Sequence, residues 1–210
     1  MDQSQTLTAI FNLRYFKYQK DLIDPQDLNY VSEYYLLENL SVGLLRDRWQ
    51  GSAEYSPVLA RSWELSKEGS WSFFLKDQMR WSDGSSMSAQ QLLSFYQDLQ
   101  KQKHRHISLI KQAKITYNST THALVFEFSN SKLASGLLHE LALADCGVLH
   151  PQNLENDWSV SSGPYYVHAS DSGKIELKKN PYYLGSAPNI AQVNIHPPQF
   201  AERQDFDIMK

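Results

Sequence analysis

The strongest helical pattern in this sequence lies in residues 88–99. Its apolar positions recur at i, i+3, i+4 and i+7, which are Leu92, Phe95, Tyr96 and Leu99. This spacing places them on one face of a helix, so we expect that face to be buried. Ser88 precedes the run and Gln91 follows three residues later, which is the spacing of a capping box. The pattern therefore predicts a helix that begins directly after Ser88.

Two further segments have helical spacing. A helix is predicted from about Tyr30 to Leu45, after the break at Asp24-Pro25, and Gly43 lies close to its expected end. Another helix is predicted from Lys132 to about Leu143, where leucines recur on one side.

The remaining apolar segments are short and bounded by turn residues, which is typical of strands. The predicted strands are Thr6–Leu13, Ala60–Leu65, Trp71–Lys76, Lys114–Tyr117, Ala123–Phe128, Tyr165–Val167, Lys174–Lys179 and Gln192–His196. Gly69 and Gly84 each stand in a polar turn, where a left-handed backbone is expected. Strands and helices alternate without a regular βαβ rhythm, so the pattern favours a mixed α+β lobe.

Composition narrows the classes of function. The chain has 210 residues, of which 41% are hydrophobic and 20% charged, as in an ordinary globular core. Its formal net charge of -3 provides no basic excess for a phosphate backbone, which excludes nucleic-acid binding by this segment. No apolar run is long enough to span a bilayer, so we expect no membrane insertion.

The sequence alone leaves two cellular compartments possible for the protein. The N-terminal residues lack the basic and long apolar regions of a signal peptide. The protein is therefore cytoplasmic, or the sequence begins after a removed signal. Its single cysteine, Cys146, rules out an internal disulfide and fits either compartment.

Several short motifs stand in a fixed order along the chain. They are Ile23-Asp24-Pro25, Leu59–Ser66 (LARSWELS), Trp81–Gly84 (WSDG), Ser161–Tyr165 (SSGPY), Lys178–Tyr183 (KKNPYY) and Gln204–Ile208 (QDFDI). In this order they resemble the periplasmic peptide-binding proteins of ABC importers, solute-binding protein family five. The chain departs from the family pattern at Lys76, where the family has Arg, and at Gln90-Gln91, where it has an acidic pair.

The resemblance implies an α+β, mixed-sheet lobe of a two-lobed periplasmic binding protein, type II-like and of cluster C, with the chain ending before the second lobe. Residues 1–45 and about 160–210 would form part of the main sheet of lobe one. Residues from about 46 to 159 would form an inserted subdomain. For such a portion alone we expect reduced stability and no tight ligand binding.

The resemblance also implies a binding protein and not an enzyme, with no cofactor and no catalytic residue. Its partners would be a small peptide or other small solute and the ABC permease subunits. It would act as a periplasmic monomer by hinge closure around the solute. An alternative is the ligand-sensing domain of a cytoplasmic transcription regulator, since some regulators carry a module of this family.

Ligand contacts are expected at Asn29, Tyr30 and Val31, because the segment after the Asp-Pro break lines the cleft in peptide-binding relatives. An Asn amide and free main-chain groups suit an extended peptide. The other interpretation is a helix N-terminus with Asn29 as the N-cap.

Other chemistry-bearing residues favour structural roles. Trp63, Trp71 and Trp81 are possible ligand platforms, but their place on predicted strands favours core packing. His104 and His106 have no further ligand at a usual spacing, so we predict no metal site. Cys146 is expected to be a buried structural residue, and no motif supports a hydrolase.

Overall fold

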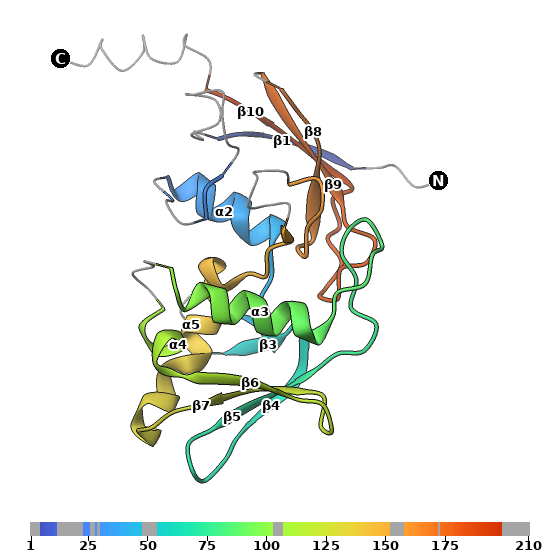
Figure 1. Cartoon of the computed structure of the whole chain (residues 1–210). Coiled ribbons are helices and arrows are strands. Elements are labelled where there is room, and N and C mark those ends of the chain that lie inside the picture. The colour runs from blue at the N-terminus through green and yellow to red at the C-terminus, as the bar shows by residue number, and fades with distance from the viewer. Residues whose placement is uncertain are drawn as a thin grey trace, which may run out of the picture.

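The computed structural model describes residues 5–11, 23–25, 28, 30–47, 54–102, 107–151, 158–171 and 173–198. Two β-sheets lie at opposite ends of the molecule, and helices α2 and α3 lie between them (Figure 1). None of the described helices is both long and apolar enough to cross a bilayer.

The first sheet combines the start of the chain with its later part. Its strands are β1 (Thr6–Ile10), β8 (Tyr165–Asp171), β9 (Lys174–Lys179) and β10 (Gln192–His196), in the order β1-β10-β9-β8. β1 runs parallel to β10, and the other pairs are antiparallel. Helix α2 (Val31–Leu40) shares a buried apolar cluster with this sheet, to which Leu37 and Leu40 contribute from the helix and Ile175 and Ile195 from the strands.

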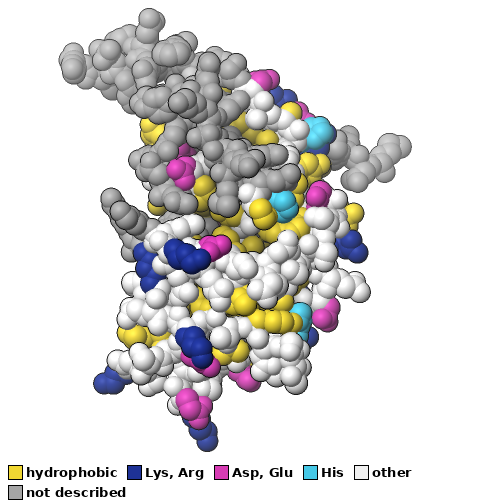
Figure 2. Space-filling model, viewed as in Figure 1, with side chains coloured by type: hydrophobic (Ala, Val, Ile, Leu, Met, Phe, Trp, Pro, Cys, Tyr) yellow, Lys and Arg dark blue, Asp and Glu magenta, His cyan; other side chains and the backbone are white. Residues whose placement is uncertain are grey.

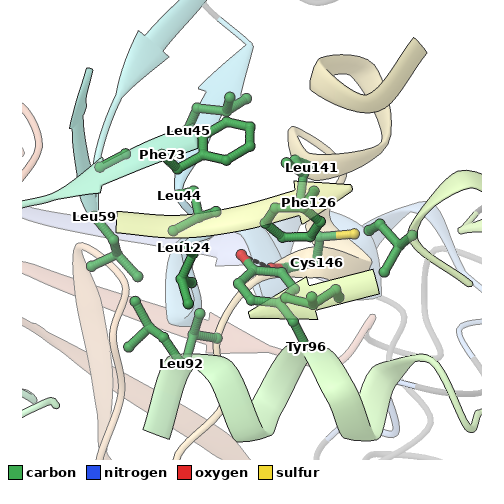
Figure 3. Packing of buried hydrophobic residues seen from close by; sticks show 14 of the residues in the cluster. Leu44, Leu45, Leu59, Phe73, Leu92, Tyr96, Leu124, Phe126, Leu141 and Cys146 are labelled. Atoms are coloured by element: carbon green, nitrogen blue, oxygen red, sulfur yellow. Dashed lines mark hydrogen bonds between the residues drawn. The ribbon is translucent and has the colours of Figure 1, made fainter. Parts of the chain in front are cut away.

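The second sheet is antiparallel throughout. It contains β4 (Ala60–Leu65), β5 (Trp71–Leu75), β6 (Lys114–Asn118) and β7 (Ala123–Glu127), in the order β4-β5-β7-β6. Helix α3 (Ala89–Leu99) packs on it (Figure 3). Phe73 and Phe126 meet edge to face, with centroids 5.4 Å apart, and Tyr96 is fully buried beside Phe126. Burying each such side chain stabilises the fold by about 1.5–3 kcal/mol.

Shorter elements complete this half. They are β2 (Leu45–Asp47), β3 (Tyr55–Pro57), α4 (Ser108–Gln112), the 3₁₀ helix η1 (Ser131–Gly136), α5 (Leu137–Leu141) and the 3₁₀ helix η2 (Ala144–Cys146). Whether the two halves correspond to the predicted division at residues 45 and 160, as separate domains, stays a prediction.

The local predictions with the strongest chemical signals are confirmed. The Ser88 hydroxyl accepts a hydrogen bond from the Gln91 amide at 3.2 Å, and the Gln91 side chain accepts one from the Ser88 amide at 2.7 Å. Gly69 and Gly84 have φ angles of 86° and 85°, the left-handed region that favours glycine.

The predicted helix from Tyr30 to Leu45 is wrong at its C-terminal end, because α2 stops at Leu40. The next residues are held by distant segments: the Val42 amide donates to the Ser162 hydroxyl at 3.0 Å. The Val42 carbonyl accepts from the Val148 amide at 2.9 Å. These long-range hydrogen bonds favour an extended backbone over a continued helix.

The helix predicted over Lys132–Leu143 is only partly correct. The segment begins as the 3₁₀ helix η1, and the α-helical part is the five-residue α5. Gly136 stands at the change between the two, and glycine weakens a helix interior.

The segment Ser161–Pro164 ties the two halves together. The Ser161 amide donates to the Ser82 hydroxyl at 2.9 Å, and the Gly163 amide donates to the Leu40 carbonyl at 3.1 Å. The Asn180 side chain donates to the Gly163 carbonyl at 2.8 Å. A Cβ on Gly163 would lie 2.5 Å from the backbone of Leu40, so only glycine fits this crossing.

Candidate functional site

A cavity of about 420 Å³ lies between helix α3 and the chain that leads to α2. Its walls come from the Asp24-Pro25 break, from Trp81, from one side of α3 with its flanking residues, and from residues 145–151. We call it the α3 pocket. Hydrophobic side chains are visible at this waist of the molecule, between the layers of α2 and α3 (Figure 2). Its volume is within the range of small-molecule sites in proteins.

Helix α3 supplies the longest wall of the pocket. Phe95 and Leu99 present apolar surface, and Ser94 and Asp98 stand on the exposed side of the same wall. The capping box at Ser88 fixes where this helix begins and therefore which side chains face the pocket. The amphipathic pattern that predicted the helix thus also positions a functional wall.

Trp81 forms a second, rigid wall. Its side chain is 1% exposed, and its ring meets the His150 ring edge to face with centroids 4.9 Å apart. Within the described part of the chain, the indole N–H of Trp81 has no hydrogen-bond acceptor. Trp71, in contrast, donates its indole N–H to the Ala134 carbonyl at 2.7 Å. Trp71 therefore has the predicted core role, whereas Trp81 is both core and pocket wall.

The third wall carries Asp145 and Leu149, and the neighbouring thiol of Cys146 belongs to the core. Burial raises the pKa of the Cys146 thiol well above its ordinary value, and the negative charges of Asp145 and Glu140 raise it further. The thiol therefore stays protonated and is a poor nucleophile. The expectation of a buried cysteine at this position is confirmed.

Three acidic side chains are part of the described lining: Asp24 at the Asp-Pro break, Asp98 on α3 and Asp145 on the third wall. The described lining also contains His150, and it contains no Lys or Arg. Asp98 also pairs at 2.7 Å with the exposed Lys101, which follows the C-terminus of the helix. An exposed pair of this kind is screened by water, so it offsets the charge of Asp98 only in part.

Of the predicted ligand contacts, the two that the structure describes, Tyr30 and Val31, are not among the residues that line the pocket. Asn29 is outside the described residues. Tyr30 is the N-cap of α2, and its amide donates to the Glu33 carboxylate at 3.1 Å. The alternative of a helix N-terminus at this segment is therefore confirmed, but its expected N-cap, Asn29, is wrong. Val31 begins the helix and is 69% exposed. The contact of these three residues with a ligand stays a prediction.

The sequence analysis missed the exposed apolar face of α2. Tyr34 and Tyr35 are 37% and 45% exposed and stand three and four residues after Val31, so the three side chains share one helix face. The spacing of these three residues is visible in the sequence, but apolar residues on a buried helix face have the same spacing. The face extends an apolar surface from the segment of the predicted contacts.

The remaining candidates do not form a site in the described part of the chain. His104 and His106 lie outside the described residues. Among the described residues, no group of three or more His, Cys, Asp or Glu side chains is placed to hold a metal ion.

Comparisons with known proteins agree on one family. The family model for bacterial extracellular solute-binding proteins, family 5 Middle, matches residues 54–203. In sequence, the chain is 26% identical over 160 residues to the probable D,D-dipeptide-binding periplasmic protein DdpA of Escherichia coli K12. That match covers 70% of this chain and 30% of DdpA.

Solved structures share the fold over nearly the whole chain. The Escherichia coli murein tripeptide binding protein MppA superposes with a TM-score of 0.75 at 17% identity, covering 100% of this chain and 45% of MppA. NikA of Brucella suis, solved with Fe(III)-EDTA, gives a TM-score of 0.71 at 18% identity, covering 97% of this chain and 42% of NikA. The expected α+β lobe of a two-lobed binding protein is thus confirmed, and this chain spans less than half the length of these relatives. It belongs to family 5 of the bacterial extracellular solute-binding proteins.

Proposed function

We propose that this chain forms part of the first lobe of a solute receptor for an ABC importer and that its solute is a peptide or another small molecule held at the α3 pocket. The observation that carries the proposal is the position of that pocket. It lies where the Asp-Pro break, helix α3 and residues 145–151 meet, and in the sequence this break shortly precedes the segment in which ligand contacts are expected.

The relatives support a small solute and a peptide in particular. DdpA is described as binding a D,D-dipeptide, and MppA as binding a murein tripeptide. NikA, solved with a metal chelate, shows that the same fold also takes other small solutes. The family consists of binding proteins, which supports a receptor without catalytic activity.

The proposed mechanism is closure of a second lobe over the solute, after which the closed form docks on the permease. A solute stabilises the closed form only as far as it binds that form better than the open one. The receptor would act as a periplasmic monomer. No observation on the described residues favours the alternative of a regulator's sensor domain.

The test is calorimetric titration of the receptor that contains this chain with pools of di- and tripeptides. Ser94 lines the pocket from an exposed position, so Ser94→Arg fills the pocket without disturbing the core. We expect this variant to bind the best pool at least about tenfold more weakly, a loss of about 1.4 kcal/mol.

The matched control is Ser135→Arg, because Ser135 is exposed on η1 and does not line the pocket. The control is expected to bind as the unmodified protein does. Equal binding by both variants would show that the solute lies elsewhere and would overturn the proposed site.

A further inference from the structure

A second, smaller cavity of about 180 Å³ lies at the C-terminal end of helix α2. We call it the α2 pocket. Its described walls come from the last turn of α2, from the chain that continues into β2, and from residues 142–147. It has no described lining residue in common with the α3 pocket, so the two cavities are separate sites.

Small residues make the hollow of the α2 pocket. Gly43, Ala142, Ala144 and Gly147 all belong to its lining. Its volume equals that of about six molecules of liquid water, at about 30 Å³ each. The α2 pocket therefore suits a ligand of a few non-hydrogen atoms and is too small for a peptide of several residues.

Glu38 brings a negative charge to the α2 pocket. It is half-buried in the last turn of α2, and its carboxylate accepts no hydrogen bond from the described part of the chain. Burial raises the pKa of Glu38, and the positive charge of Arg46 lowers it. A negative charge near the C-terminus of a helix is also unfavourable. A ligand that donates from a cationic group would stabilise this carboxylate.

Arg46 brings a positive charge to the same cavity from β2. It acts on Glu38 through its charge, but the two side chains form no ion pair. One guanidinium nitrogen of Arg46 donates to the Tyr183 hydroxyl at 3.3 Å, and its other N–H groups have no acceptor among the described residues. Asp47 also lines the α2 pocket; burial and the charge of Asp47 raise the pKa of Tyr55, so this charge acts outside the cavity as well.

We propose that the α2 pocket binds a small zwitterion, such as a free α-amino acid, with its ammonium group at Glu38 and its carboxylate at Arg46. The opposite charges of the pocket come from two different elements and are not joined in an ion pair, and an α-amino acid carries opposite charges on one small body. A purely anionic ligand would leave Glu38 without a donor, and a purely cationic one would leave Arg46 without an acceptor. This site lies outside the proposed solute site.

The test is a methyl-detected NMR titration of the receptor that contains this chain, labelled at its Ala, Leu and Val methyl groups. Ala142, Leu143 and Ala144 report on the α2 pocket, and Leu99 and Leu149 report on the α3 pocket. Glycine is the probe that carries both charges at about pH 7. Acetate lacks the ammonium group, and methylammonium lacks the carboxylate.

We expect glycine to shift the methyl signals of Ala142 and Ala144 saturably and to bind at least about tenfold more tightly than acetate or methylammonium. Glu38→Gln should weaken glycine binding about tenfold without weakening acetate. Arg46→Gln should weaken glycine binding to a similar extent without weakening methylammonium.

The matched controls are Glu64→Gln and Arg61→Gln, because both residues are exposed on β4 and neither lines the α2 pocket. Both controls are expected to bind glycine as the unmodified receptor does. Equal affinity for the three probes, or equal weakening by the variants and their controls, would overturn the assignment of the two charges. If glycine shifts no methyl signal of the α2 pocket, the inference is wrong. The peptide titration with Ser94→Arg decides separately whether the proposed function holds.

Discussion

The carboxylate of Glu140 caps helix α4 at the amide of Leu109, from 31 residues further along the chain. Both carboxylate oxygens lie 2.9 Å from the Leu109 nitrogen. The same group accepts from the Ser108 hydroxyl and the Ile110 amide, each at 3.0 Å. Glu140 is 7% exposed, so its charge is compensated by these donors and by the positive end of the helix.

Replacing Glu140 by Ala should therefore destabilise the fold strongly. The substitution leaves the α4 amides without acceptors in a buried place, and we expect a loss of about 2–4 kcal/mol in the free energy of unfolding. Urea denaturation followed by circular dichroism measures this loss. Glu127→Ala is the control, because Glu127 forms only an exposed pair with Lys114 and should cost at most about 1 kcal/mol. Equal losses for the two variants would contradict the capping role.

The close contact between Gly163 and the Leu40 backbone predicts that replacement by Ala affects stability very differently at two glycines. A Cβ at Gly163 would lie 2.5 Å from the Leu40 backbone, which has no flexible end that can move aside. We expect Gly163→Ala to cost about 1–3 kcal/mol or to prevent folding. At Gly173 the nearest atom, Asp171 Oδ1, is an ordinary 3.6 Å away, so Gly173→Ala should change stability little. Thermal denaturation of both variants compares them, and similar melting temperatures would show that the two halves do not pack as described.

A substitution at Val31 can distinguish a role in solute binding from a role in stability. It is 69% exposed, so Val31→Ser should change the free energy of unfolding by no more than about 0.5 kcal/mol. If Val31 contacts the solute as predicted, the same variant should bind peptides more weakly in calorimetry. Leu65→Ser is a control, because Leu65 is 48% exposed on β4, away from the pocket. Unchanged peptide affinity in Val31→Ser would remove this residue from the site.

Because the Cys146 thiol is buried, we expect the stability of the folded protein to fall at alkaline pH. Burial raises its pKa in the folded protein, whereas an unfolded thiol titrates near about 8.5. Below that pH both states keep the proton, so the folded protein loses nothing. Above it only the unfolded state releases the proton, and stability falls as the pH rises. The unmodified protein should therefore lose stability between about pH 8 and 10 relative to Cys146→Ala, measured by denaturation at each pH. A constant difference across this range would contradict a buried, protonated thiol.

The sequence predicted the parts of the fold whose signals are local. The capping box at Ser88, the glycine turns and the short apolar strand predicted at Ala123–Phe128 depend on neighbours a few residues away. The bounds of the helix after Asp-Pro depend instead on the Ser162 hydroxyl at Val42, 120 residues distant. Helix α4 escaped prediction because its cap, Glu140, comes from another element.

The candidate site was predictable only in part for the same reason. The Asp24-Pro25 break and the amphipathic run of α3 were both recognised in the sequence. That these two segments lie close together in space depends on the tertiary fold, which no local pattern predicts. Trp81 was expected in the core, and its exposed fraction of 1% agrees with this. Its second role as pocket wall follows from the positions of His150 and α3, which no local pattern encodes.

The central claim, a solute site at the α3 pocket, is tested most directly by NMR titration of the labelled chain with the tightest-binding peptide pool. The account predicts saturable amide shifts at Val31, Ser94, Phe95 and Leu149, with residues of the β4–β5 turn unaffected. Shifts centred away from α3 and residues 145–151, or no shifts at millimolar peptide, would contradict it.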